Sequence, residues 1–311
     1  MSRPRAFSKL DVAGVRRSFE ARVRTAAALD QSAARRLVAR LPPERWTLEW
    51  YLPWWLGNAL GLDQATSTEL VLSNLLGLAS VRLQDDLADD ESGEAADAPR
   101  LAAALYEAAL APYTSRFGPE SPLWAHIERC MATWRAAATD PSGDHRLAAR
   151  GEPLKIAPFA QCLLAGRIGT YPAIESCLDH ALEALVRYDH VADWRADLEA
   201  GRWNAFVADV SSGPQVPGSR SRHAQAVLLA MLTSDVVTTQ FAGIRDGFLA
   251  AADVATDLAR TDDLPIPGLV GHLRRRAAEA EAQGTTFAAQ YRDLGDQAAK
   301  QLFTPPPDGR S

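Results

Sequence analysis

An apolar run over residues 75–83 passes directly into the segment 85–91, which holds five carboxylates within seven residues. The run reads as a helix, and carboxylates near a helix C-terminus face the negative end of the helix dipole. Carboxylates four residues apart, such as Asp85 and Asp89, also repel one another on a helix. No basic residue is interleaved, although Arg82 lies one turn before Asp86 and could pair with it. A bound multivalent cation would relieve the repulsion, so the segment is a candidate metal site.

The rest of the chain has the periodicity of helices. Of its 311 residues 47% are hydrophobic, apolar residues recur at three- and four-residue spacing, and alternating β-type patterns are almost absent. We predict an all-α, single-domain helical bundle over residues 1–303, followed by a Pro-rich, disordered tail over 304–311. The predicted helices are 9–29, 31–41, 43–61, 66–90, 98–116, 121–138, 153–167, 172–201, 221–260, 267–282 and 284–302.

Composition excludes several classes of protein. The formal net charge of -6 argues against a general nucleic-acid binder, which would present a basic face. The three cysteines, Cys130, Cys162 and Cys177, form no CxxC pair and lie in apolar, helical contexts, which favours buried, reduced thiols. The N-terminus lacks the apolar core of a signal peptide, and no apolar run is long enough to span a bilayer. We therefore expect a cytoplasmic protein without a transmembrane segment.

A second acidic pattern lies on the predicted helix 172–201. Asp189, Asp193 and Asp197 are spaced by four residues, and each step turns the helix by roughly 40°, so all three share one face. The nearby arginines, Arg187 and Arg195, are each two residues from an Asp and point elsewhere. His190 lies about 100° from Asp189, which favours a packing role for it. One such stripe would read as a solvated face, but two on the most apolar helices favour a metal site. Ligand sets made of carboxylates alone select a hard cation, and Mg²⁺ fits best.

The two acidic segments resemble the motifs of a known superfamily. Residues 85–89, Asp-Asp-Leu-Ala-Asp, resemble the DDxxD motif of class I isoprenoid synthases. Residues 193–202, with Asp193, Asp197 and the pair Gly201-Arg202, resemble the DxxxD…GR segment of squalene and phytoene synthases. The spacing of Asp189, Asp193 and Asp197 is also similar to that of the metal-binding triad of terpene cyclases.

The resemblance implies a fold and an activity. The fold would be the helical bundle of class I isoprenoid synthases, with a central apolar cavity. The enzyme would ionise a trans-allylic prenyl diphosphate, of the farnesyl or geranylgeranyl class, and cyclise or quench the carbocation with release of pyrophosphate. The resemblance also allows for a homodimer. Mg²⁺, as three ions with diphosphate bound, would be held by Asp85, Asp86, Asp89, Asp189, Asp193 and Asp197, of which Asp85, Asp86, Asp89 and Asp193 are the expected catalytic residues.

Further residues are candidates for binding the substrate. Lys155, Arg167 and Arg202 would supply the cationic contacts that a diphosphate needs. Arg202 could instead cap a helix. A carbocation favours aromatic walls, and four of the eight tryptophans lie within residues 46–55. Trp50, Trp54 and Phe159 are the expected wall residues, against the alternative that the tryptophans pack an N-terminal helix onto the bundle.

Departures from the family motifs keep several functions open. No basic pair follows the first motif, and the second region is not a full DDxxD, which counts against chain elongation. Terpene cyclisation is the leading hypothesis, and head-to-head condensation of the squalene or phytoene type is the alternative. An all-α nucleotide pyrophosphohydrolase and a non-catalytic helical protein are the alternatives from other classes.

Overall fold

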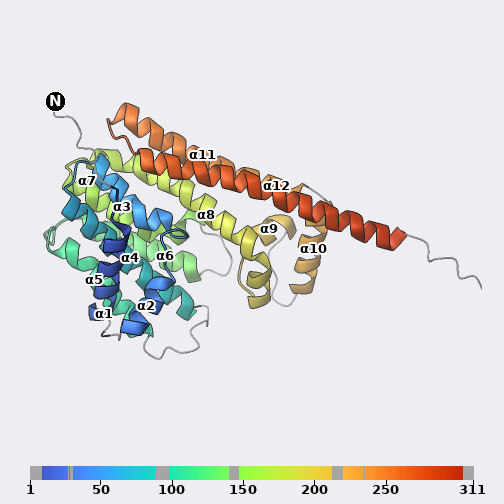
Figure 1. Ribbon diagram of the computed structural model, residues 1–311, viewed down its shortest axis with the longest axis horizontal. Coiled ribbons are helices and arrows are strands. Elements are labelled where there is room, and N and C mark those ends of the chain that lie inside the picture. The colour runs from blue at the N-terminus through green and yellow to red at the C-terminus, as the bar shows by residue number, and fades with distance from the viewer. Residues whose placement is uncertain are drawn as a thin grey trace, which may run out of the picture. The chain divides into compact units, whose positions relative to one another are not determined.

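The computed structural model describes residues 9–26, 28, 31–88, 98–139, 147–211, 220–233 and 235–303. These residues form twelve α-helices and two 3₁₀ segments, and none of them lies in a strand (Figure 1). The all-α prediction is confirmed, while the predicted tail 304–311 lies outside the described residues. The elements are α1 (Val12–Ala26), α2 (Gln31–Ala39), α3 (Thr47–Ala59), α4 (Gln64–Ala88), α5 (Ala98–Thr114), α6 (Pro122–Thr139), η1 (Leu147–Lys155), α7 (Ile156–Leu164), η2 (Ile168–Thr170), α8 (Tyr171–Ala200), α9 (Ala205–Ser211), α10 (Arg220–Thr233), α11 (Val236–Thr261) and α12 (Pro267–Phe303).

The helices group into two compact units. Unit 1 comprises residues 1–139, 149–179 and 251–272, and unit 2 comprises residues 140–148, 180–250 and 273–311. Helices α8, α11 and α12 each contribute residues to both units. The single domain over 1–303 stays a prediction.

The core of unit 1 is built around α4, which packs against α3 and α5. Helix α4 is apolar around much of its circumference, which is typical of a helix with neighbours on several sides. Two of its buried serines bond to α5: the hydroxyl of Ser73 donates to the carbonyl of Ala109 at 2.6 Å, and that of Ser80 to the carbonyl of Ala102 at 2.7 Å. Small side chains at this contact let the backbones of α4 and α5 approach closely. The acidic end of α4 therefore stands on a rigid, buried helix.

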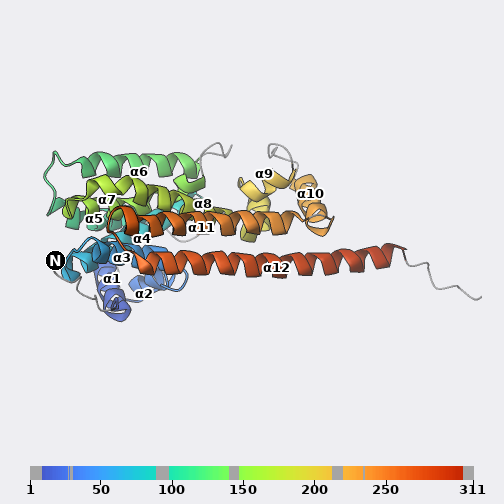
Figure 2. The same ribbon diagram turned by 90° about the horizontal axis from the view of Figure 1, so that it is seen from above.

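Glycines mark the close helix contacts of unit 2. A Cβ on Gly284 of α12 would lie 2.5 Å from the Cβ of Phe241 on α11, and one on Gly247 would lie 3.1 Å from the Cβ of Ala184 on α8. The prediction of separate helices over 267–282 and 284–302 is wrong, because α12 runs unbroken through Gly284 beside α11 (Figure 2). Glycine weakens a helix, but here it makes room for a neighbouring side chain.

Three other boundaries also differ from the prediction. The helix expected over 221–260 is two helices, α10 and α11, and α11 begins just after Asp235, a residue type that favours helix N-termini. Helix α9 was not predicted. The helix expected over 153–167 starts instead as the 3₁₀ segment η1 and becomes α-helical only at Ile156.

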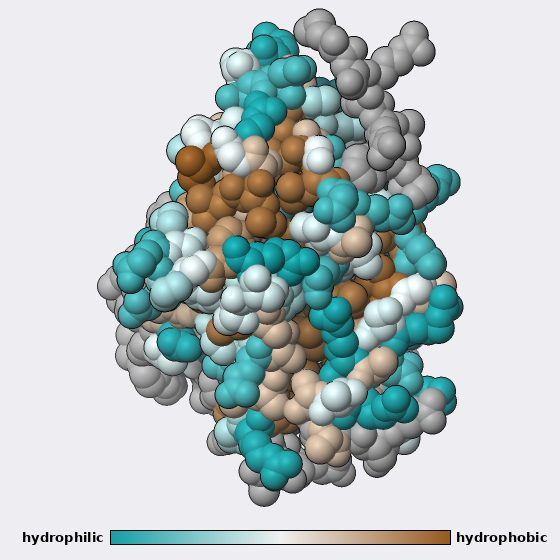
Figure 3. Space-filling view, turned by 90° about the vertical axis from the view of Figure 1, so that its left-hand side faces the viewer, coloured by the Kyte–Doolittle hydropathy of each residue, from teal (hydrophilic) through white to brown (hydrophobic). Residues whose placement is uncertain are grey.

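The surface carries both apolar and hydrophilic areas. Figure 3 shows one face on which an apolar area is bordered by hydrophilic side chains. Within the described residues, no single helix is long and apolar enough to cross a membrane, although the bent pair 223–232 and 236–261 meets that test of length and composition together.

Candidate functional site

The acidic end of α4 carries a cluster of mixed charge. Asp85 and Asp86 lie in the last turn of the helix, and the side chain of Asp86 is only 10% exposed. Arg82 places Nη1 3.7 Å from Oδ2 of Asp85 and Nη2 3.8 Å from Oδ1 of Asp86. Arg40, which follows α2, donates from Nη2 to Oδ2 of Asp86 at 2.5 Å. The third residue of the motif, Asp89, lies outside the described residues.

Two arginines lie close to these carboxylates. Arg82 is one turn back on the same helix, as its spacing allowed, and it contacts both Asp85 and Asp86. Arg40 comes from 46 residues upstream and was not foreseen, because helix periodicity gives no information on contacts between helices. The two guanidinium groups offset the repulsion between adjacent carboxylates and the unfavourable helix dipole.

Two indole N–H groups hold the backbone that carries Arg40. Nε1 of Trp46 donates to the carbonyl of Arg40 at 3.2 Å, and Nε1 of Trp50 donates to the carbonyl of Leu41 at 3.0 Å. The guanidinium of Arg82 lies over the Trp46 ring, 5.6 Å from its centroid. Trp46, just before α3, and Trp50, within α3, therefore position Arg40 through backbone hydrogen bonds, and Trp46 positions Arg82 by cation–π attraction.

The predicted aromatic wall residues are core residues. Trp50 is 0% exposed and meets Phe19 edge to face at 6.4 Å, and Trp54 is 4% exposed in the same core cluster. This is the packing alternative for the tryptophan segment. The central apolar cavity that these residues were expected to line stays a prediction.

The second acidic stripe lies on α8, in unit 2. Asp189 and Asp193 are exposed, whereas the side chain of Asp197 is 15% exposed and bonded. Its Oδ1 accepts from Nε of Arg202 at 3.1 Å, and its Oδ2 accepts from Nδ2 of Asn204 at 2.7 Å. Two residues of the stripe therefore face solvent, and the third, Asp197, binds the segment that follows α8.

The pair Gly201-Arg202 forms the C-terminal cap of α8. The N–H of Gly201 donates to the carbonyl of Leu198 at 3.2 Å, and the N–H of Arg202 donates to the carbonyl of Asp197 at 2.8 Å. Gly201 has a φ of 76°, so these bonds make a Schellman motif, in which glycine takes the left-handed position. This is the cap that was the alternative for Arg202, and its left-handed position explains the glycine at 201.

His190 has the packing role that its position predicts. It is 5% exposed, its Nδ1 accepts from the N–H of Ala205 at 3.1 Å, and its carbonyl accepts from Nδ2 of Asn204 at 2.9 Å. The ring also meets Trp203 edge to face. These bonds hold the start of α9 against α8.

Two predicted diphosphate-binding cations are bonded within unit 1. Nζ of Lys155 lies 2.7 Å from both Oε1 of Glu152 and Oδ1 of Asp179, and the lysine side chain is 1% exposed. Arg167 donates from Nη2 to the carbonyl of Asp262. Both arrangements join segments of the fold, and a role of either residue in substrate binding stays a prediction.

The third wall candidate, Phe159, belongs to a buried cluster that the sequence reasoning missed. Its ring stacks on His126 at 3.9 Å, and Nε2 of His126 lies 3.4 Å from Sγ of Cys130 and 3.3 Å from Oη of Tyr171. The spacing of His126 and Cys130, four residues apart on one helix, was the available signal. Burial, reinforced by the nearby Arg129, lowers the pKa of His126 to about 4.

Protonation states make this cluster unsuited to nucleophilic catalysis. Burial raises the pKa of Cys130 to about 12, and it also raises the pKa of Tyr171. A thiolate and an imidazolium are the reactive forms of a Cys–His pair, and both are disfavoured here. The cluster therefore packs α6, α7 and α8 together. Cys130, Cys162 and Cys177 are all buried and free, as predicted.

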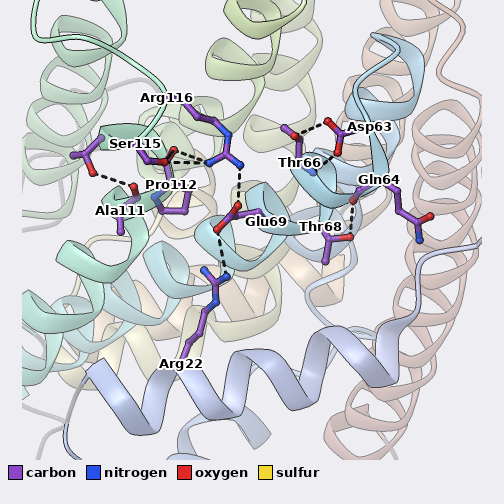
Figure 4. A network of polar contacts seen from close by, with 11 residues as sticks. Arg22, Asp63, Gln64, Thr66, Thr68, Glu69, Ala111, Pro112, Ser115 and Arg116 are labelled. Carbon is purple, nitrogen blue, oxygen red and sulfur yellow. Dashed lines mark hydrogen bonds and ion pairs between the residues drawn. The ribbon is translucent and has the colours of Figure 1, made fainter.

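An open depression of about 520 Å³ lies on unit 1 away from these residues, lined by Arg22, Gln64, Ala65, Thr68, Glu69 and Leu72. One lining group is the carboxylate of Glu69, which accepts from Arg116 at 2.8 Å and from Arg22 at 3.4 Å (Figure 4). The hydrogen bond from Arg116 is the main cause of a lowered pKa of Glu69. None of the predicted site residues lines this depression.

The described residues hold no group of three His, Cys, Asp or Glu side chains that could bind a metal ion. The described part of the first motif nevertheless has donors of the right kind, because Asp85 and Asp86 present carboxylates, the ligands that Mg²⁺ prefers. Comparison with protein-family models, curated proteins and solved structures finds no match to the chain. The case for a function therefore rests on the motifs and on the geometry at the acidic helix ends.

Proposed function

We propose that the protein is a Mg²⁺-dependent class I isoprenoid synthase that ionises a trans-allylic prenyl diphosphate, with cyclisation as the favoured outcome. The observation that carries the proposal is the mixed-charge cluster at the end of α4. Carboxylates of Asp85 and Asp86 suit a hard cation, and the guanidinium groups of Arg40 and Arg82 suit phosphate oxygens. A metal–diphosphate pair needs both kinds of group.

Different residues would bind the metal, bind the diphosphate and position the site. Asp85 and Asp86 on α4 would hold Mg²⁺, which when bound supplies positive charge to the departing diphosphate. The resemblance assigns Asp189 and Asp193 on α8 the same kind of role. Arg82 is oriented by the Trp46 ring and would hold a phosphate oxygen. The family motif also includes Asp197, but its bonds to Arg202 and Asn204 favour a positioning role for that carboxylate.

Incubation with geranyl, farnesyl and geranylgeranyl diphosphates in the presence of Mg²⁺ tests the proposal, with product identification and pyrophosphate release as the readouts. A single-substrate hydrocarbon or alcohol supports cyclisation, and a C30 or C40 product supports the head-to-head alternative. Pyrophosphate released from nucleoside triphosphates alone would point to a pyrophosphohydrolase. If neither a product nor pyrophosphate release is detected, the protein is a non-catalytic helical protein.

Variants of the proposed metal ligands, compared with a control variant that loses the same charge elsewhere, distinguish a role in the site from a general effect of charge. We expect Asp86→Asn and Asp193→Asn each to lower kcat/KM by about 100-fold or more, since each removes a group that stabilises charge in the transition state. Glu107→Gln is the matched control, because Glu107 is exposed on α5 and also loses one negative charge. Equal activity in all three variants would contradict the proposal.

A further inference from the structure

Arg40 lies over the carboxylate of Asp86 from the solvent side. The arginine side chain is 54% exposed and the aspartate side chain 10% exposed, so the guanidinium closes the open side of a nearly buried acid. The contact uses Oδ2 of Asp86, while Oδ1 lies near Arg82. Both oxygens of this predicted metal ligand therefore already face a positive charge.

Hydrogen bonds hold the backbone of Arg40, whereas its side chain contacts Asp86 through the guanidinium group at its end. Trp46 and Trp50 donate to the carbonyls of residues 40 and 41, as described above, which holds the base of the side chain in place. Arg82 differs in that its guanidinium rests on the Trp46 ring and contacts two acids of its own helix. Of the two arginines, Arg40 is the one that can leave Asp86 without disturbing α4.

A divalent ion and Arg40 compete for the carboxylate of Asp86. Arg40 donates to Oδ2 at 2.5 Å, and Mg²⁺ coordinates carboxylate oxygen at about 2.0–2.1 Å. Two positive groups on one carboxylate repel each other even when they are partly screened. Binding of the ion therefore favours departure of Arg40 from Asp86.

We propose that Arg40 is an internal cation that competes with Mg²⁺ for Asp86 and transfers to the diphosphate when substrate binds; this inference rests on the function proposed above. A guanidinium binds phosphate oxygens in a bidentate manner, which replaces the bond that Arg40 gives up. Mg²⁺ and diphosphate then bind cooperatively, because each removes an obstacle to the other. Without diphosphate, Arg40 lowers the affinity of the site for the metal.

Titration calorimetry on the full chain tests this, with Mg²⁺ alone and then with pyrophosphate at saturating Mg²⁺ as the probes. We expect Arg40→Gln to bind Mg²⁺ alone at least about threefold more tightly than the unmodified protein and to bind pyrophosphate at least about threefold more weakly. Arg40→Lys keeps the charge but loses the planar fork, so it should bind Mg²⁺ nearly as the unmodified protein does and pyrophosphate more weakly.

Arg45→Gln is the matched control, since Arg45 is exposed, lies over the Trp46 ring at 5.9 Å and carries the same charge. It should change neither affinity. An equal gain in Mg²⁺ affinity in Arg45→Gln and Arg40→Gln would reveal a general charge effect and overturn the inference. Far-UV circular dichroism and urea midpoints verify that each variant is folded.

The inference and the proposed function fail in different ways. If the protein forms products from allylic diphosphates but Arg40→Gln leaves Mg²⁺ affinity unchanged, the inference is overturned and the function stands. If the opposing shifts in the two affinities occur but no allylic diphosphate reacts, the function is overturned and the competition stands. If neither the unmodified protein nor Arg40→Gln binds Mg²⁺ alone, the inference is overturned, and the reaction with allylic diphosphates decides the function.

Discussion

Lys155 and Glu152 form an ion pair, Nζ to Oε1 at 2.7 Å, between side chains that are 1% and 2% exposed. Asp179 of α8 provides a second carboxylate at 2.7 Å, so the lysine joins η1 to the first half of α8. A charge this deeply buried is tolerated because its partners compensate for the lost hydration.

Loss of the lysine should therefore be costly. We expect Lys155→Met to lower the free energy of unfolding by about 3–5 kcal/mol, because it removes the cation paired with the buried carboxylate of Glu152. Urea denaturation measures the change. Arg260→Met is the control, since its pair with Asp257 is exposed and should contribute less than about 1 kcal/mol. A similar, small loss in both variants would show that Lys155 is not a stabilising centre.

The buried His126 predicts how stability depends on pH. The unfolded chain binds a proton at this residue near pH 6.5, but the folded protein does so only near pH 4, because burial disfavours the imidazolium. Between these values the unfolded state binds more protons, so stability rises with pH and is progressively lost as the pH falls from about 6.5 to about 4. The urea midpoint should change less with pH across this range in His126→Gln than in the unmodified protein. An equal change in both proteins would show that His126 does not cause the pH dependence.

The cap of α8 predicts a graded response at Gly201. Its φ of 76° is accessible to glycine, tolerated by asparagine and strained for a β-branched residue. We expect Gly201→Val to lower the free energy of unfolding by about 1–2 kcal/mol and Gly201→Asn to lower it by less. Equal losses in the two variants would mean that the left-handed conformation is not what selects glycine.

Gly284 and Gly243 make a contrasting pair of helical glycines. Alanine favours helix at both positions, but a Cβ at Gly284 would lie 2.5 Å from Phe241, whereas a Cβ at Gly243 meets no atom within 4 Å. We expect Gly284→Ala to destabilise by about 1–3 kcal/mol through overpacking and Gly243→Ala to be neutral or stabilising by up to about 1 kcal/mol. Thermal or urea unfolding distinguishes these outcomes, and stabilisation of both would contradict the packing seen between α11 and α12.

The long apolar helices could be predicted from sequence because their signal is local. The prediction 66–90 corresponds to α4 at 64–88, and 172–201 corresponds to α8 at 171–200. The break predicted between residues 282 and 284 is absent, and the role of Gly284 depends on Phe241, 43 positions upstream (284 - 241 = 43). Contacts of that kind leave no periodic trace in a sequence.

The same limit applies to the candidate site. The placement of Asp85, Asp86, Asp189 and Asp193 on helices followed from spacing alone. Arg40 and the indole donors beneath it could not be predicted, because three segments have to fold together before Arg40 meets Asp86. Gly201 carried a readable local signal, since glycine just past the last turn is the usual residue of a helix cap.

The three buried thiols have a practical consequence for labelling chemistry. Burial raises the pKa of Cys130 and Cys177 to about 12 and that of Cys162 to about 11, so all three are protonated and shielded at neutral pH. Maleimides and nitroxide reagents react with thiolates at accessible positions. A cysteine introduced at an exposed position, such as Glu107 on α5, would be modified selectively while the native thiols stay silent. The native cysteines therefore need not be replaced before the folded protein is labelled for spin or fluorescence spectroscopy.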